Sequence, residues 1–203
     1  MDSNIIFTIL ILIFSVVIHE VSHGYAALFL GDPTAKFEGR LTLNPLKHLD
    51  PVGSVILPIF LALIPPHFVF GWAKPVPYNP YNLRNQRWGS AIVAFAGPLS
   101  NLVIAVLFSL LIRFHENITF VPDTFFTLAG GVVLINLILA IFNLVPIPPL
   151  DGSKILFAFL PASLDSVRLA LEKYGMILVL FFILFLWQFL NPIIFSVFYF
   201  LIE

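Results

Sequence analysis

The sequence predicts an all-α polytopic membrane protein with about four to six transmembrane or re-entrant segments. Of its 203 residues, 60% are apolar and only 10% are charged, whereas a soluble domain carries about 25% charged residues. Apolar stretches near the roughly 20 residues that a bilayer crossing needs recur along the chain. This composition excludes an ordinary soluble domain, a disordered chain and a nucleic-acid binder. Because the chain has no cysteine, any metal must be held by His, Asp or Glu.

Four apolar stretches are expected to cross the bilayer: Asn4–Leu30, Trp88–Phe114, Phe120–Val145 and Tyr174–Ile202. The first is expected to stay in the mature protein, because it lacks the basic flank and the cleavage site of a signal peptide. Val52–Trp72 is apolar but contains three prolines, which are compatible with a broken or hairpin segment. Asp151–Lys173 is mixed and is expected at the interface. Partial alternation in Lys36–Asn44 suggests a short membrane-associated β element, or merely a membrane-facing hairpin.

The distribution of basic residues favours a re-entrant Val52–Trp72 segment. If it dips into the bilayer and returns while the other four stretches cross, only Arg113 lies on one side. The other basic residues then share the opposite side: Lys36, Arg40, Lys47, Lys74, Arg84, Arg87, Lys154, Arg168 and Lys173. Because positive residues gather on the cytoplasmic side, we expect the N-terminus outside and the end of the first helix near the cytoplasm.

The first apolar stretch contains His19-Glu20-Val21-Ser22-His23, an H-E-x-x-H pattern. Residues i and i+4 share one face of a helix, so both imidazoles can reach one tetrahedral zinc ion. Glu20 is then placed to take a proton from water as that water attacks a carbonyl. The alternative is a histidine pair satisfied by hydrogen bonds. Polar groups inside an apolar run are costly unless they are paired or bind a metal, which favours the metal.

Zinc needs a third protein ligand, and the candidates are Asp151 and His48. A helix has to end near Leu144, because Pro146 cannot continue it. The chain then runs extended through the prolines, and Asp151 can either turn inward or cap the helix that follows. His48 lies in a polar loop and remains possible. The other histidines fit interfacial positions: His67 and His115.

Asn143 lies near the end of the preceding apolar helix, where a carboxamide must find a partner. It can hold one helix to its neighbour, which is the usual role. It can also donate an N–H to the oxyanion that forms when a peptide carbonyl is attacked.

Three motifs in this order resemble the signatures of the site-2 protease family of intramembrane zinc metalloproteases. They are His19–His23, Ala96-Gly97-Pro98-Leu99-Ser100-Asn101, and Asn143…Pro146…Pro148…Leu150-Asp151-Gly152. The segment Phe70-Gly71-Trp72-Ala73-Lys74-Pro75-Val76-Pro77 resembles a subgroup of small prokaryotic members. The chain lacks the PDZ-like insert and the nucleotide-sensing CBS domain of larger members.

The resemblance implies one Zn²⁺ per chain, held by three ligands: His19, His23 and Asp151. It also implies that Glu20 is the general base and that Asn143 steadies the oxyanion. Gly97-Pro98 and Asn101 match the family's middle helix, where we expect packing and support of the site. Residues 1–203 are expected to form a single domain, with a catalytic core at about 4–160 and C-terminal scaffold helices at 174–202.

The expected function is that of an intramembrane zinc endopeptidase acting on transmembrane or membrane-anchored proteins. We expect a multi-pass protein of a prokaryotic cell membrane whose active site is nearer the cytoplasmic side; its oligomeric state stays open. A substrate helix must unwind locally, and Lys36–Asn44 can capture it by main-chain bonding. The alternatives are a catalytically idle zinc-binding chaperone or adaptor, and a metal transporter. The single polar cluster argues against transport, and an intact Glu20 favours the enzyme.

Overall fold

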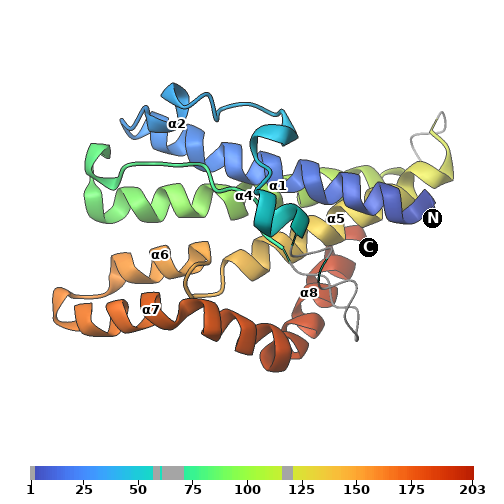
Figure 1. Ribbon diagram of the computed structural model, residues 1–203. Helices are drawn as coiled ribbons and strands as arrows, with labels where there is room; N and C mark the ends of the chain where they lie inside the picture. The colour runs from blue at the N-terminus through green and yellow to red at the C-terminus, as the bar shows by residue number, and fades with distance from the viewer. Residues whose placement is uncertain (1–2, 57–59, 61–70, 116–120) are drawn as a thin grey trace.

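The computed structural model describes the chain except for residues 1–2, 57–59, 61–70 and 116–120 (Figure 1). Helices and irregular segments make up the described residues, and no β-strand occurs among them. The helical stretches long and apolar enough to cross a membrane are Ile6–Phe29, Gln86–Arg113, Asp123–Asn143 and Asp165–Ile202. These spans confirm the prediction of an all-α polytopic membrane protein.

The long helices begin and end where local sequence signals lie. α1 (Ser3–Phe29) is followed by Gly31, whose φ of 109° suits the turn that ends the helix. α4 (Gln86–Arg113) begins after Asn85, whose side chain accepts hydrogen bonds from two backbone amides of the first turn. α5 (Asp123–Asn143) follows a proline and ends three residues before Pro146.

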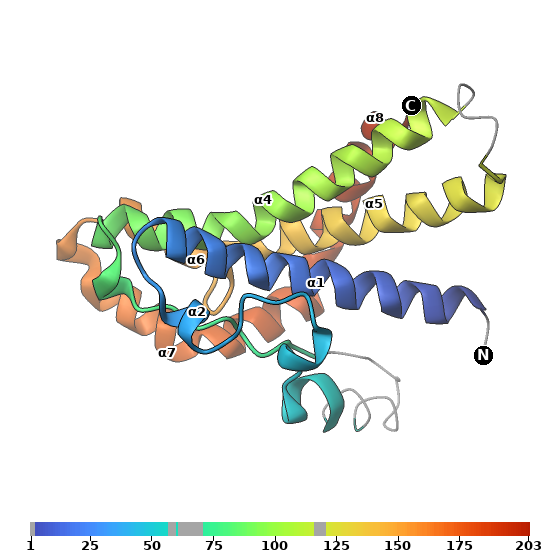
Figure 2. The ribbon, with the colours of Figure 1, turned by 90° about the horizontal axis from the view of Figure 1, so that it is seen from above.

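α4 is the central helix of the membrane-spanning part, because it contacts α1, α5 and α6 (Asp151–Phe159). Figure 2 shows α1, α4 and α5 running beside one another. Small residues are prominent among the buried positions of α4: Gly89, Ala91, Ala94, Gly97 and Ala105. Small side chains let helix backbones approach closely in a membrane, so α1, α5 and α6 can pack tightly against α4.

The C-terminal region is one long, bent helical stretch. α7 (Asp165–Phe181) passes through a π-helical segment, η6 (Phe182–Leu186), into α8 (Trp187–Ile202). In Figure 1, α7 runs beneath α6 and α8 turns away from that direction. Side chains from the end of α8 pack on Ala105 of α4 and on Val133 and Leu137 of α5. The scaffold role of residues 174–202 stays a prediction.

The predicted β element after the first helix is wrong. The region contains α2 (Thr34–Phe37), which is one helical turn, and then irregular chain. The carboxylate of Asp32 accepts hydrogen bonds from the backbone and the hydroxyl of Thr34, and Gly39 turns the chain with a φ of 62°. The hydrogen bonds that Asp32 accepts and the glycine turn therefore override the weak alternation of Lys36–Asn44.

The chain between α2 and α4 includes three further short helices: η1 (Pro45–Lys47), η2 (Pro51–Ile56) and η3 (Pro80–Asn82). Most of Val52–Trp72 lies outside the described residues, but its two ends meet. Trp72 N donates to Gly53 O at 3.1 Å, and Ser54 Oγ donates to Trp72 O at 2.7 Å. The re-entrant prediction concerns chiefly the residues that are not described, and it stays a prediction.

Candidate metal centre

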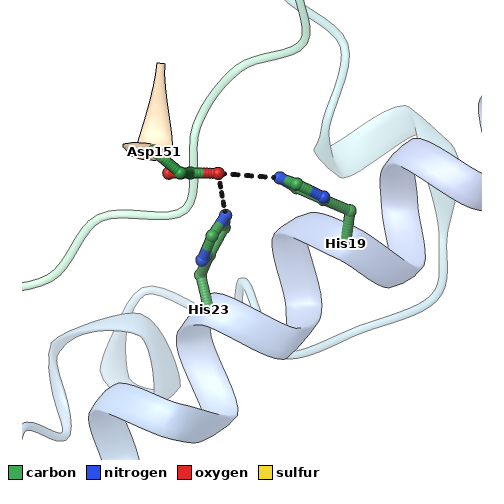
Figure 3. Close-up of side chains that lie close together, drawn as sticks. All are labelled: His19, His23 and Asp151. Atoms are coloured by element: carbon green, nitrogen blue, oxygen red, sulfur yellow. Dashed lines mark hydrogen bonds and ion pairs between the residues drawn. The ribbon is translucent and has the colours of Figure 1, made fainter. Parts of the chain in front are cut away.

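Three predicted ligands converge in the structure although one of them is distant in sequence (Figure 3). His19 Nε2 lies 3.1 Å from Asp151 Oδ2, and His23 Nε2 lies 3.2 Å from the same oxygen. The donor atoms all lie within 4.8 Å of one another. The three residues are buried, with 6 to 8% of their surface exposed. Both histidines rise from one face of α1, as their four-residue spacing requires.

Asp151 reaches the histidines because α5 has ended and a proline-rich turn returns the chain to α1. Asp151 is the first residue of α6, and no side chain caps that helix. The capping alternative is therefore wrong. The Lys154 ammonium lies 3.5 Å from Asp151 Oδ1, and a cation this close favours the ionised form of the carboxyl group.

The outer nitrogen of each imidazole is held by a carbonyl oxygen. His19 Nδ1 lies 2.6 Å from Asn101 Oδ1, and His23 Nδ1 lies 2.6 Å from Val93 O. Since these oxygens only accept, we assign the proton of each neutral ring to Nδ1. Each Nε2 then carries a lone pair that faces Asp151.

Two imidazole lone pairs and a carboxylate therefore meet in a buried space, and their mutual repulsion calls for a cation. Two nitrogens and one oxygen from three residues are a donor set that catalytic zinc accepts, with a fourth position left for water or substrate. Hydrogen bonds to the outer nitrogens are the usual means of fixing metal-bound histidines. The residues present therefore fit zinc.

Buried amides support the site from behind. Asn101 Nδ2 donates to Asn136 Oδ1 at 2.8 Å, and Asn136 Nδ2 donates to Ser15 Oγ at 2.9 Å. Both asparagines are fully buried, and the bonds join α1, α4 and α5. Asn101 thus lies where the family resemblance expects support. Sequence reasoning missed Asn136 and Ser15; the available signal was a polar residue inside an apolar helix.

Gly97 lets α4 pass directly beside the two histidines. A Cβ atom at this position would lie 2.5 Å from Nε2 of both His19 and His23. Real Cβ atoms do not approach other atoms so closely, so a larger residue would push the ligands away. This position supports the site, as the resemblance suggests.

Glu20 and Asn143 line the same cavity as the ligands, which has a volume of about 470 Å³. Glu20 Oε2 accepts a hydrogen bond from Val76 N at 2.8 Å. Asn143 Nδ2 donates to Leu139 O of its own helix at 2.9 Å, which leaves its second amide proton for another acceptor. The structure brings both residues to the site, and their chemical roles stay predictions.

His48 is not a ligand. Its ring is buried in the loop after α2, and Nε2 donates to Thr42 O at 2.8 Å. Throughout the described part of the chain, His19, His23 and Asp151 form the only group able to hold a metal. His115 is exposed just beyond the end of α4. His67 lies outside the described residues.

Comparison with known proteins agrees with these motifs. Residues 121–186 match the description "Peptidase family M50". The chain is 37% identical over 195 residues to "Putative zinc metalloprotease YwhC" of Bacillus subtilis. The aligned region covers 92% of this chain and 81% of that protein. It is 32% identical over 166 residues to "Putative zinc metalloprotease Rip2" of Mycolicibacterium smegmatis, which covers 81% of this chain and 61% of that protein.

An archaeal relative is "Zinc metalloprotease MJ0392" of Methanocaldococcus jannaschii, 31% identical over 163 residues, 79% of this chain and 37% of that protein. No solved structure matches. Asn143 and Asp151 both fall inside the matched family region, and the similarity to YwhC extends over 92% of the chain. The chain therefore belongs to peptidase family M50, the site-2 protease family that its three motifs resemble.

Proposed function

We propose that this zinc metalloprotease is an intramembrane endopeptidase, which hydrolyses peptide bonds in or near the transmembrane segments of membrane-anchored proteins. The position of the converging ligands carries the proposal. Two of them belong to Ile6–Phe29, an apolar span of 24 residues. His23 lies about 9 Å along the helix axis from Phe29. A scissile bond must come to that depth to be cut.

The proposed mechanism assigns a task to each residue. His19 and His23 would hold zinc through Nε2, and Asp151 would hold it through its carboxylate. When bound, zinc polarises a carbonyl and lowers the pKa of a coordinated water to about 7. Glu20 takes the proton of the attacking water and delivers it to the departing amide nitrogen. Asn143 donates its second amide proton to the carbonyl oxygen as negative charge develops.

The substrate must be held in extended form, because a helical segment has its amides bonded internally. Gly71–Ala73 lines the cavity and has no regular secondary structure. The backbone amides of Trp72 and Lys74 bond away toward Gly53 and His48. Ala73 lies between them and makes no hydrogen bond to the described residues. Because the backbone of Ala73 is uncommitted among the described residues and lines the cavity, we assign the capture of substrate by main-chain bonding to Ala73 rather than to Lys36–Asn44.

Water and products have a route at the more basic end of the molecule. A second cavity of about 1070 Å³ shares with the metal cavity the lining residues Pro75, Tyr78, Pro149, Lys154 and Met176. Arg84 lies at the same end of the molecule as the end of α1, because its N donates to Leu30 O. Arg113 lies at the opposite end of α4 from Gln86, in the last turn of that helix. The positive-inside rule then orients the cavity toward the cytoplasm of a prokaryotic cell.

The decisive experiment exchanges Glu20 for Gln. Zinc content, measured on the purified protein, is expected to remain at one per chain, because Glu20 is not a ligand. Cleavage of a membrane-anchored substrate in vesicles is expected to fall by about 10²–10⁴-fold, the usual contribution of a general base. Glu38→Gln is the matched control, since Glu38 is exposed outside the site. Undiminished cleavage by Glu20→Gln would refute the assignment, and an inactive wild type would favour the chaperone alternative.

A further inference from the structure

The carboxylate of Glu20 is held by the backbone of a distant segment. Oε2 accepts from the N–H of Val76 at 2.8 Å, and no other hydrogen bond to the Glu20 carboxylate occurs among the described residues. Val76 stands between Pro75 and Pro77, which have no N–H. Its amide is therefore the sole backbone hydrogen-bond donor of this tripeptide, and it donates to Glu20.

The packing of the Val76 side chain fixes the distance between that amide and α1. Val76 is 6% exposed. A Cβ atom at Gly24 would lie 2.9 Å from Val76 Cγ1, so the valine packs against the helix one turn beyond Glu20. The absent side chain at Gly24 lets the segment lie this close.

A buried arginine holds the same segment from its other side. Arg40 Nη2 donates to Lys74 O at 2.9 Å and to Pro75 O at 3.3 Å, and Arg40 is 5% exposed. Lys74 N donates to His48 O at 2.8 Å. The proline rings also fix φ on both sides of Val76. The amide of Val76 is therefore presented by a rigid backbone.

We propose that Val76 is the positioning residue of the general base, and that Arg40 acts through it by holding the Lys74–Pro77 segment. This rests on the proposed function, in which Glu20 accepts a proton. An untethered glutamate beside His19 can turn onto the metal as an extra ligand. The N–H of Val76 keeps one carboxylate oxygen occupied and leaves the other for the attacking water.

The kinetic test compares Val76→Pro, which removes the N–H, with Val76→Ala, which keeps it. Val76→Pro is expected to lower kcat by about 10–100-fold, as loss of outer-shell partners does, with KM and zinc content unchanged. Val76→Ala keeps the N–H but loses part of the packing that positions it, and is expected to lower kcat several-fold less than Val76→Pro does. Arg40→Met is expected to lower kcat in the wild type but to add little to Val76→Pro. Equal losses from Val76→Pro and Val76→Ala, or no loss from Val76→Pro, would overturn the proposal.

Hydrogen exchange provides a readout that needs no cleavage. The amide of Val76 is expected to exchange at least about tenfold faster in Glu20→Ala than in wild type, because the acceptor is gone. Glu20→Gln keeps an acceptor oxygen and is expected to stay protected, as is Glu38→Ala. Unchanged protection in Glu20→Ala would contradict the contact even if the protease is active. Lost protection in a protein that cleaves nothing would contradict only the proposed function.

Discussion

At the scale of single residues, the absence of a side chain at Gly97 matters as much as the ligands. The α4 backbone passes so near His19 and His23 that a methyl group would strike Nε2 of both rings. The outer nitrogens of the same rings are tied to carbonyl oxygens. The imidazoles are thus confined on both sides, which fixes their lone pairs toward the metal.

Gly97→Ala is therefore expected to weaken zinc binding by about 10–100-fold, similar to loss of an outer-shell contact. The physical reason is displacement of both imidazoles. Titration of the metal-free protein with zinc measures the effect. Gly130→Ala in α5 is the control, because a Cβ atom there meets nothing within 4 Å. Equal zinc affinity in the two variants would argue against the close approach.

Asp151→Ala is expected to lose bound zinc, since two imidazoles on one turn remain as the only ligands. Metal analysis of the purified protein measures the loss. His48→Ala is expected to keep one zinc per chain, because His48 bonds to Thr42 and lies away from the site. The reverse pattern would make His48 the third ligand after all.

Much of the site could be predicted because helical spacing alone places His19 and His23 on one face. Asp151 was ambiguous, since a first-turn aspartate serves equally well as a cap until the partner helix is known. Asn136 could not be found, because a lone asparagine in an apolar helix has many possible partners. The bond between Glu20 and Val76 depends on the path of an irregular segment, which no periodicity encodes.

At the scale of elements, Asp32 joins the end of α1 to the chain that enters α4. Its carboxylate is fully buried and accepts from the Thr34 hydroxyl at 2.6 Å, Asn79 N at 2.6 Å and Asn82 Nδ2 at 2.8 Å. Burial raises its pKa, but these hydrogen bonds outweigh burial and lower the pKa below its ordinary value. The Asp32 carboxylate thereby links α2 and η3 to the end of α1, the helix that carries His19 and His23.

The contribution of Asp32 to stability is expected to depend on pH. A carboxyl whose folded pKa is depressed stabilises the fold above its unfolded pKa of about 3.9, and loses that effect as the pH falls through the folded value. The unfolding temperature of Asp32→Asn in detergent is therefore expected to lie below that of wild type at pH 7, with a gap that narrows below about pH 4. Asp123→Asn, at an exposed position, is expected to show no such gap. A gap independent of pH would contradict the role of the charge.

The first three apolar spans could be predicted within about three residues, because length and hydropathy suffice for them, whereas the fourth begins at Asp165, nine residues before the predicted Tyr174. The short β element could not be excluded from the sequence, since the hydrogen bonds to Asp32 and the turn at Gly39 decide that region locally. The break between α7 and α8 also went unpredicted. A π-helical segment within an unbroken apolar run, Phe182–Leu186, has no compositional marker.

At the scale of the whole molecule, the basic residues define an orientation that can be measured. The chain has no cysteine, so single cysteines report on their own positions. In intact cells, a membrane-impermeant maleimide is expected to label Arg113→Cys and to spare Lys36→Cys until the cells are permeabilised. This result follows if positive residues face the cytoplasm. Labelling of Lys36→Cys from outside would reverse the proposed orientation.

The distance in sequence between the ligands also bears on biosynthesis. His19 and Asp151 are 132 positions apart, so a ribosome adding about 5–20 residues per second needs roughly 7 to 26 seconds to reach the second after the first. During that interval the nascent chain exposes a histidine pair without its acidic partner. The three-ligand metal site is therefore expected to assemble only after Asp151 has been synthesised.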